Sequence, residues 1–150
     1  MRNSVLNWVT VALTLAFLVP FSVQAEQAKD FGKYRIHYSA IQTSFLSPKV
    51  SHDYGISRSR NRIMLNIAVQ EKTADGKNKS IVASVNVTAT NLTGQLKSLS
   101  MRPIHDRDVI YYIGELSVAN QETLDFKVDV KPENTKENLV FNFRQKFYTR

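Results

Sequence analysis

Apolar and polar residues alternate over much of this chain, most clearly within the segment Tyr54–Gln70. Ile63, Leu65, Ile67 and Val69 occupy every second position there, and side chains two residues apart in a strand lie on one face. The polar or small residues between them fall on the other face. The pattern predicts a strand with one buried face, and we take it as the centre of the fold.

Six further segments alternate in the same way or are continuously apolar, and turn-forming residues separate them. They are Lys33–Ile41, Ser80–Thr90, Leu96–Met101, Val109–Val118, Thr123–Val130 and Leu139–Tyr148. The run Val109–Val118 begins apolar on both alternating faces, which predicts a central strand covered on both sides. Pro103 is expected to end the strand before it, Ile104–Asp108 to form a charged loop, and Glu26–Lys33 to be a polar lead-in.

Two local signals predict how the first strand connects to the central one. Ser47 followed by Pro48 is typical of a helix start, with serine as the N-cap and proline at the first helical position. Gly55 is expected to end this helix after one or two turns. Asp75-Gly76 then predicts a hairpin turn after the central strand.

Seven strands, one short helical turn and no long helix predict an all-β protein built as an antiparallel β-sandwich. A small closed barrel is the alternative. We find no internal repeat and no interdomain linker, so residues 26–150 are expected to form a single domain.

The first 25 residues have the pattern of a secretory signal peptide. Arg2 supplies the positive start, Val9–Val19 is almost wholly apolar, and Pro20 is followed by small residues that predict cleavage after Ala25. A membrane anchor is the alternative, but the apolar run is shorter than the roughly 20 residues needed to span a bilayer. The sequence therefore predicts an exported protein.

Composition narrows the chemistry of the remaining chain. Arg2 is the only charged residue of the leader, so the other 19 basic residues exceed the 13 acidic ones by 6. There is no cysteine, which excludes disulfides, a thiol nucleophile and a thiolate metal site. The excess charge lacks the interleaved aromatic residues that nucleic-acid binding favours, so no nucleic-acid partner is expected.

Three arginines precede the central strand at every second position, namely Arg58, Arg60 and Arg62. If this stretch is extended, they share the outward face and could bind an acidic partner through paired hydrogen bonds. Two other interpretations stay open: the charges only keep the strand end soluble, or one arginine pairs with an acid such as Glu115. The turn from Asn91 to Gln95 is a second candidate contact surface.

The best candidate for acid–base or metal chemistry is the group His105, Asp106 and Asp108, a histidine beside two carboxylates. No nucleophile stands at an informative spacing from it. His37 and His52 lie on other elements, and only convergence in space would make the three histidines a zinc site. No phosphate-binding glycine loop or nucleotide motif is present, and no cofactor is expected.

Several stretches together resemble the domain-of-unknown-function family 4426, a group of small exported proteins of Gram-negative bacteria. They are KDFGKYRIHYSA (Lys29–Ala40), FLSPKV (Phe45–Val50), YGISRSRNR (Tyr54–Arg62), ATNLTGQL (Ala89–Leu96), IYYIGE (Ile110–Glu115) and QKFY (Gln145–Tyr148). The resemblance covers the chain after the leader, in the same order. It implies a periplasmic, immunoglobulin-like β-sandwich and no particular activity.

These observations predict a non-enzymatic binding or accessory module in the periplasm, whose partner is an envelope protein or an anionic envelope component. The alternative is a small-ligand or metal-dependent activity centred on His105, Asp106 and Asp108. The last strand ends almost at the final residue, Arg150, so it could lie at a sheet edge, where envelope domains accept added strands. The oligomeric state is not indicated.

Overall fold

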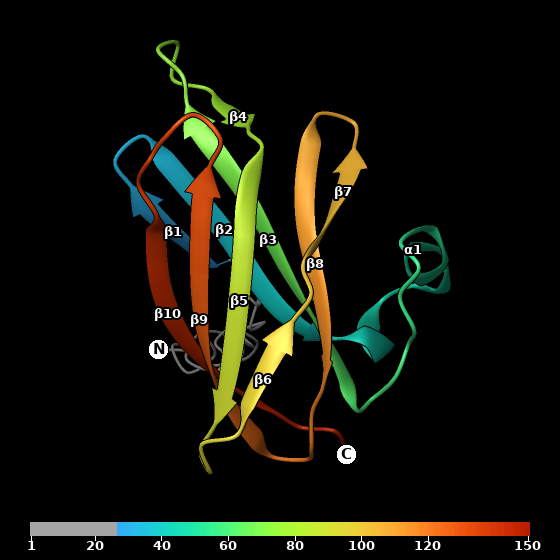
Figure 1. Ribbon diagram of the computed structural model, residues 1–150. Helices are drawn as coiled ribbons and strands as arrows, with labels where there is room; N and C mark the ends of the chain where they lie inside the picture. Colours follow the sequence, from blue (N-terminus) through green and yellow to red (C-terminus); the bar gives the residue numbers. More distant parts are fainter. Residues whose placement is uncertain (1–26) are drawn as a thin grey trace, which may run out of the picture.

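The computed structural model describes residues 27–150, which form ten strands in two layers (Figure 1). The strands are β1 (Gln27–Phe31), β2 (Tyr34–Gln42), β3 (Arg62–Lys72), β4 (Asn78–Ser80), β5 (Ala83–Asn91), β6 (Leu96–Leu99), β7 (Arg102–Asp106), β8 (Val109–Ser117), β9 (Glu122–Pro132) and β10 (Leu139–Phe147). The helical segments are η1 (Thr43–Phe45) and α1 (Pro48–Asp53). The predicted all-β sandwich is confirmed, with more strands than the seven expected.

The predicted leader, residues 1–25, and its cleavage site after Ala25 lie outside the described residues. Within residues 27–150, no helix has the length and apolar character needed to cross a membrane.

All strand pairs are antiparallel, and β3 occupies the middle of the larger sheet. That sheet has the order β1-β2-β3-β8-β7, and the short β4 pairs with the far end of β3. The smaller sheet has the order β10-β9-β5-β6. The predicted central position of the Tyr54–Gln70 strand is therefore confirmed, and β10 lies at a sheet edge.

The main core fills the space between the two sheets. Ile63, Leu65, Ile67 and Val69 of β3 are completely buried there, as their alternation predicts. The opposite face of β3 is not uniformly exposed, because Met64 packs with two isoleucines in a second, smaller cluster on the outer side of the sheet. Both faces of this sheet are thus covered near α1.

The chain passes from one sheet to the other between β4 and β5, where we predicted one continuous strand, Ser80–Thr90. The Ile81 amide still donates to the Val69 carbonyl of the larger sheet at 3.0 Å. The Val82 carbonyl already accepts from the Glu133 amide beside the smaller sheet, also at 3.0 Å. The alternation of apolar residues continues through this transfer, which is why the sequence pattern did not reveal it.

The transfer is fixed by a hydrogen bond between the sheets. The Ala83 amide of β5 donates to the hydroxyl of Tyr112 of β8 at 2.8 Å, in a buried position. We expect Tyr112→Phe to lower the free energy of unfolding by about 1–3 kcal/mol, because it leaves this buried amide without an acceptor. Urea unfolding would measure the loss. Tyr148→Phe, at a side chain that is 57% exposed, is the control; an equal loss in both variants would contradict the explanation.

Two predicted irregular segments are in fact edge strands. The expected lead-in contains β1, which pairs with β2 over its whole length although its side chains are mostly exposed. The expected charged loop belongs mostly to β7, which includes Pro103 and pairs with β8. Proline is tolerated there because the N–H it lacks would face solvent at an edge. Backbone pairing with a neighbouring strand, and not an apolar face, determines both strands.

The predicted short helix is confirmed as α1. The Ser47 hydroxyl accepts a hydrogen bond from the Val50 amide at 3.2 Å, and Pro48 occupies the first turn. Gly55 follows with a positive φ of 63°, a conformation that costs glycine little.

Candidate functional site

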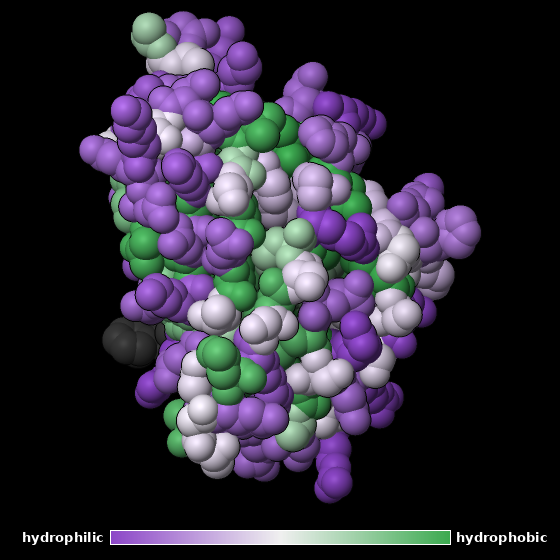
Figure 2. Space-filling model, viewed as in Figure 1, coloured by the Kyte–Doolittle hydropathy of each residue, from purple (hydrophilic) through white to green (hydrophobic). Residues whose placement is uncertain are grey.

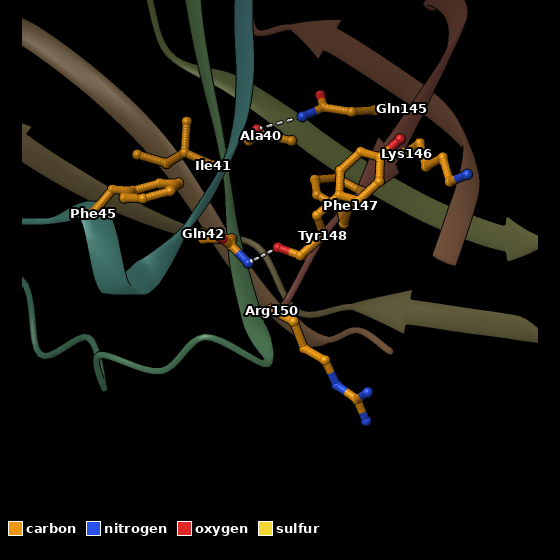
Figure 3. A pocket seen from close by; sticks show the side chains of 9 residues that line it. All are labelled: Ala40, Ile41, Gln42, Phe45, Gln145, Lys146, Phe147, Tyr148 and Arg150. Atoms are coloured by element: carbon orange, nitrogen blue, oxygen red, sulfur yellow. Dashed lines mark hydrogen bonds between the residues drawn. The ribbon is translucent and has the colours of Figure 1, made fainter. Parts of the chain in front are cut away.

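A cleft of about 340 Å³ opens where β2 and β10 end (Figure 3). One wall comes from β2 and η1, and the other from the last six residues of the chain. The lining residues are Ala40, Ile41, Gln42, Phe45, Gln145, Lys146, Phe147, Tyr148 and Arg150. The cleft thus joins two segments that are about a hundred positions apart in the sequence.

Two glutamine side chains hold the walls of the cleft together. The Gln145 side-chain amide donates to the carbonyl of Ala40 at 2.9 Å. The Gln42 side-chain amide donates to the carbonyl of Tyr148, and to the carbonyl of Arg60 at 3.0 Å. These bonds connect the larger sheet, the C-terminal segment and the loop before β3.

Two large aromatic side chains border the cleft and are exposed. Phe45 is 77% and Tyr148 57% accessible, although exposing an aromatic ring costs the hydrophobic energy that burial would gain. Lys146 places its ammonium 5.3 Å from the centre of the Tyr148 ring, within cation–π distance. Arg150 projects away from the walls toward solvent (Figure 3). The lining contains two cationic side chains and no acidic side chain.

The predicted arginine stripe is not continuous, because β3 begins only at Arg62 and the residues before it are not in a strand. The Arg58 guanidinium donates to the carbonyl of Ser44, next to Phe45, at 3.0 Å. The Arg60 carbonyl is bound by Gln42, so this exposed residue also lies beside the cleft. Two of the three arginines therefore stand at the border of the cleft.

Arg62 has a different environment. Its guanidinium lies 3.4 Å from a carboxylate oxygen of Glu115 on β8, and both side chains are partly covered. This is the ion pair that one of the interpretations of the sequence anticipated. A positively charged group already matched by a carboxylate is less available to a ligand, so we leave Arg62 out of the candidate site.

The structure brings Asn91 and Gln95 together, but their side chains hold the β5–β6 turn. The side-chain oxygen Oδ1 of Asn91 accepts hydrogen bonds from the backbone amides of Thr93 at 3.1 Å and Gln95 at 2.8 Å. The Asn91 amide group donates to the side chain of Gln95 at 3.2 Å and to Glu122 at 3.3 Å. Both residues are engaged within the turn.

The side chains of His105, Asp106 and Asp108 do not come together in one site. His105 and Asp106 are neighbours in β7, so their side chains point to opposite faces, and Asp108 lies in the following turn. Asp106 accepts a hydrogen bond from the Tyr54 hydroxyl at 3.2 Å; burial and this carboxylate raise the pKa of Tyr54. Among residues 27–150, no three His, Cys, Asp or Glu side chains are grouped closely enough to hold a metal ion.

His105 instead lines a second cavity of about 410 Å³ between β5 and β7, with Met101 and Tyr112 among its other lining residues. Apolar surface shows through the polar surroundings of this face in Figure 2. Met101 and His105 both line this cavity. They are four positions apart, and four positions along an extended chain span about 13 Å, which is too far for both side chains to bind one ion. These two side chains therefore do not form a joint ion site.

Sequence reasoning missed the residues of the cleft itself. The exposure of Phe45 and Tyr148 cannot be read from the sequence, because isolated aromatic residues usually predict core positions. The alternation of the last strand does place Lys146 and Tyr148 on the outer face, opposite Gln145 and Phe147. That was the available signal.

The fold and the cleft define a small β-sandwich with a positively charged, aromatic-bordered cleft at one end. Residues 28–150 match the model of a family described as domain of unknown function, DUF4426, and the chain belongs to this family. The resemblance noted in the sequence is thereby confirmed. No sequence among the curated proteins matches the chain.

Several solved structures are similar to this chain. PA0388 of Pseudomonas aeruginosa PAO1, a DUF4426 family protein, is 28% identical with a TM-score of 0.73, over 84% of this chain and 97% of PA0388. FetP of the uropathogenic Escherichia coli strain F11, recombinantly expressed in the periplasm, is 11% identical with a TM-score of 0.59, over 83% of this chain and 94% of FetP. A variant of FetP was solved with copper bound. The likeness to FetP concerns the fold alone.

Proposed function

We propose that this protein is an exported, non-enzymatic binding module that holds an acidic group of a periplasmic envelope partner in the cleft between β2 and β10. The observation that supports this most is the charge of the cleft. Lys146 and Arg150 line it without an acidic side chain, and Arg58 and Arg60 stand at its border. The leader pattern supports export, as does the expression of a protein of similar fold in the periplasm.

The cleft supports recognition by charge together with apolar contact. A carboxylate or phosphate would pair with Lys146, while Phe45 and Tyr148 would cover an adjoining apolar part of the ligand. Exposed ion pairs contribute only about 0.2–1 kcal/mol each, so the affinity is expected to be modest and to fall with added salt.

The alternative function, a metal- or ligand-dependent activity at His105, Asp106 and Asp108, has less support. Copper binding by the FetP variant is a property of that protein, and the three side chains here do not converge. We therefore direct the first test to the cleft.

The test is to titrate residues 26–150 with a hexaglutamate peptide and to measure the binding by isothermal titration calorimetry. We expect the double variant Lys146→Gln/Arg150→Gln to bind about tenfold more weakly, because it loses two charge contacts. The matched control, Lys127→Gln/Lys131→Gln, makes the same charge change at exposed positions outside the cleft and should bind like the unchanged protein.

Equal weakening in both double variants would show that the peptide follows the net charge, and the cleft would then not be the site. Failure of the unchanged protein to bind hexaglutamate even at low salt would contradict the proposed function.

A further inference from the structure

β2 is longer than the strand that pairs with its outer edge. The register between β1 and β2 starts at Gln27 opposite Tyr38, so within residues 27–150 no strand lies beside Ser39–Gln42 on that side. On the other side, β3 pairs with these four residues continuously. Among the described residues, the end of β2 therefore has no strand partner on its outer side.

The direction of the backbone groups along this edge follows from two hydrogen bonds. The carbonyl of Lys33, an odd-numbered residue, accepts from the Lys72 amide on the β3 side at 2.8 Å. The carbonyl of Ala40, an even-numbered residue, accepts from the Gln145 side chain on the free side at 2.9 Å. Because backbone groups alternate along a strand, Ala40 and Gln42 direct their amides and carbonyls to the free edge.

The Gln145 side chain donates to the Ala40 carbonyl the hydrogen bond that the backbone of a neighbouring strand would otherwise donate. Ala40 is 4% exposed, and a buried carbonyl needs a hydrogen-bond donor. A side-chain amide can fill this position and can also be exchanged for the backbone N–H of an incoming chain. The carbonyl is thus satisfied without being permanently paired to a strand.

The cleft supplies the space for such a chain. Ala40, Ile41 and Gln42 form one of its walls, so its volume of about 340 Å³ adjoins the free edge (Figure 3). Four residues in a strand span about 13 Å. Lys146 and Arg150 on the opposite wall favour an acidic side chain in the segment that enters.

We propose that the partner enters the cleft as an extended, acidic peptide segment of about four residues that adds to β2 beside Ser39–Gln42. This inference rests on the proposed function and specifies its partner as a polypeptide bound through its backbone. The added strand takes the place of the Gln145 amide at the Ala40 carbonyl. Its acidic side chains lie toward Lys146 and Arg150, and the backbone bonds supply affinity that exposed charges alone do not.

The other sheet edges are less suited to accept a strand. β7 carries Pro103 and a charged end, and the paired part of β6 is only four residues long. β10 presents Arg144 on its outer face, paired with Asp125, and charged side chains of this kind discourage edge pairing.

The test uses capped hexapeptides of alternating valine and glutamate. One is unmodified, a second carries N-methyl groups on its valines, and a third on its glutamates. Backbone groups and side chains alternate with the same period, so each methylated peptide loses its donors along one edge only and keeps its charge. Strand addition predicts that one methylated peptide binds at least about tenfold more weakly than the other. It also predicts slower hydrogen exchange at the Ala40 and Gln42 amides with the unmodified peptide.

If both methylated peptides bind as well as the unmodified one, strand addition is wrong, while the acidic-ligand function of the cleft stands. If neither the alternating peptides nor hexaglutamate bind, both proposals are wrong. Slower exchange at other strand edges, without change at Ala40 and Gln42, would also overturn the assignment of the added strand to β2.

Discussion

Replacing Phe126 by alanine is expected to lower the free energy of unfolding by about 3–5 kcal/mol, the usual cost of removing a buried phenylalanine. Phe126 of β9 is 1% exposed. Its ring stacks on Phe143 of β10, with the ring centres 4.6 Å apart and the planes at 8°. The ring of Phe147 lies nearly perpendicular to it, with the ring centres 6.2 Å apart. Alanine would leave a cavity that these rings cannot fill without moving. The free energy of unfolding of a small domain is about 5–15 kcal/mol, so the variant should be close to unfolding.

Urea unfolding followed by circular dichroism would measure this effect. Val140→Ala is the control, since Val140 lies on the adjacent strand but is 42% exposed, and the loss there should stay below about 0.5 kcal/mol. A loss of less than about 1 kcal/mol for Phe126→Ala would mean that the aromatic cluster does not organise the core between the sheets.

The second large effect is expected at Glu122, at the start of β9. Its carboxylate accepts from the Lys97 ammonium at 2.7 and 2.8 Å and from the Ala119 amide at 2.8 Å. The two side chains of this ion pair are only 21% and 10% exposed. Glu122→Gln removes the negative charge and leaves Lys97 partly buried without its counter-ion. We expect a loss of about 2 kcal/mol in the free energy of unfolding.

The matched control is the exposed ion pair of Arg144 and Asp125, whose atoms are equally close at 2.6 Å. Arg144→Gln should cost less than about 1 kcal/mol, because water already screens that pair. Comparable losses in the two variants would show that burial does not strengthen the pair at Glu122.

The effect at Glu122 should depend on pH. Burial alone would raise the pKa of Glu122, but the hydrogen bonds from Lys97, the Ala119 amide and Asn91 outweigh it and hold the pKa below its ordinary value. A carboxyl group with a lowered pKa stabilises the fold at pH values above its unfolded pKa of about 4.3. That stability is lost as the pH falls through the folded pKa. The difference between the unchanged protein and Glu122→Gln should therefore be full at pH 7 and shrink below pH 4.

The elements that the sequence predicted correctly are those with a buried face of their own. β2, β3, β9 and β10 alternate so regularly that both their positions and their inward residues could be assigned. β1 could not be predicted, since its side chains are nearly all exposed and its pairing with β2 is made by backbone bonds. Such bonds leave no pattern in the side chains.

The candidate site was only partly predictable for a related reason. The arginine segment drew attention to the correct region, and Arg58 and Arg60 do border the cleft. The cleft itself depends on the end of β2 lying beside the end of β10 and the segment that follows it. The meeting of these two segments is determined by the order of the strands in the two sheets. The pattern of one strand cannot show which distant strand will lie beside it.

The transfer of the chain between sheets at Ile81 and Val82 has a consequence for folding kinetics. Neither sheet is a continuous stretch of sequence, because β8 and β7 of the larger sheet follow β5 and β6 of the smaller one. The two sheets cannot form one after the other as the chain lengthens, and key pairings such as Arg62 opposite Ser117 join distant residues. Folds rich in such distant pairings fold slowly, on a scale of milliseconds to seconds. A chain of this kind would remain open to proteases until β9 has joined β5.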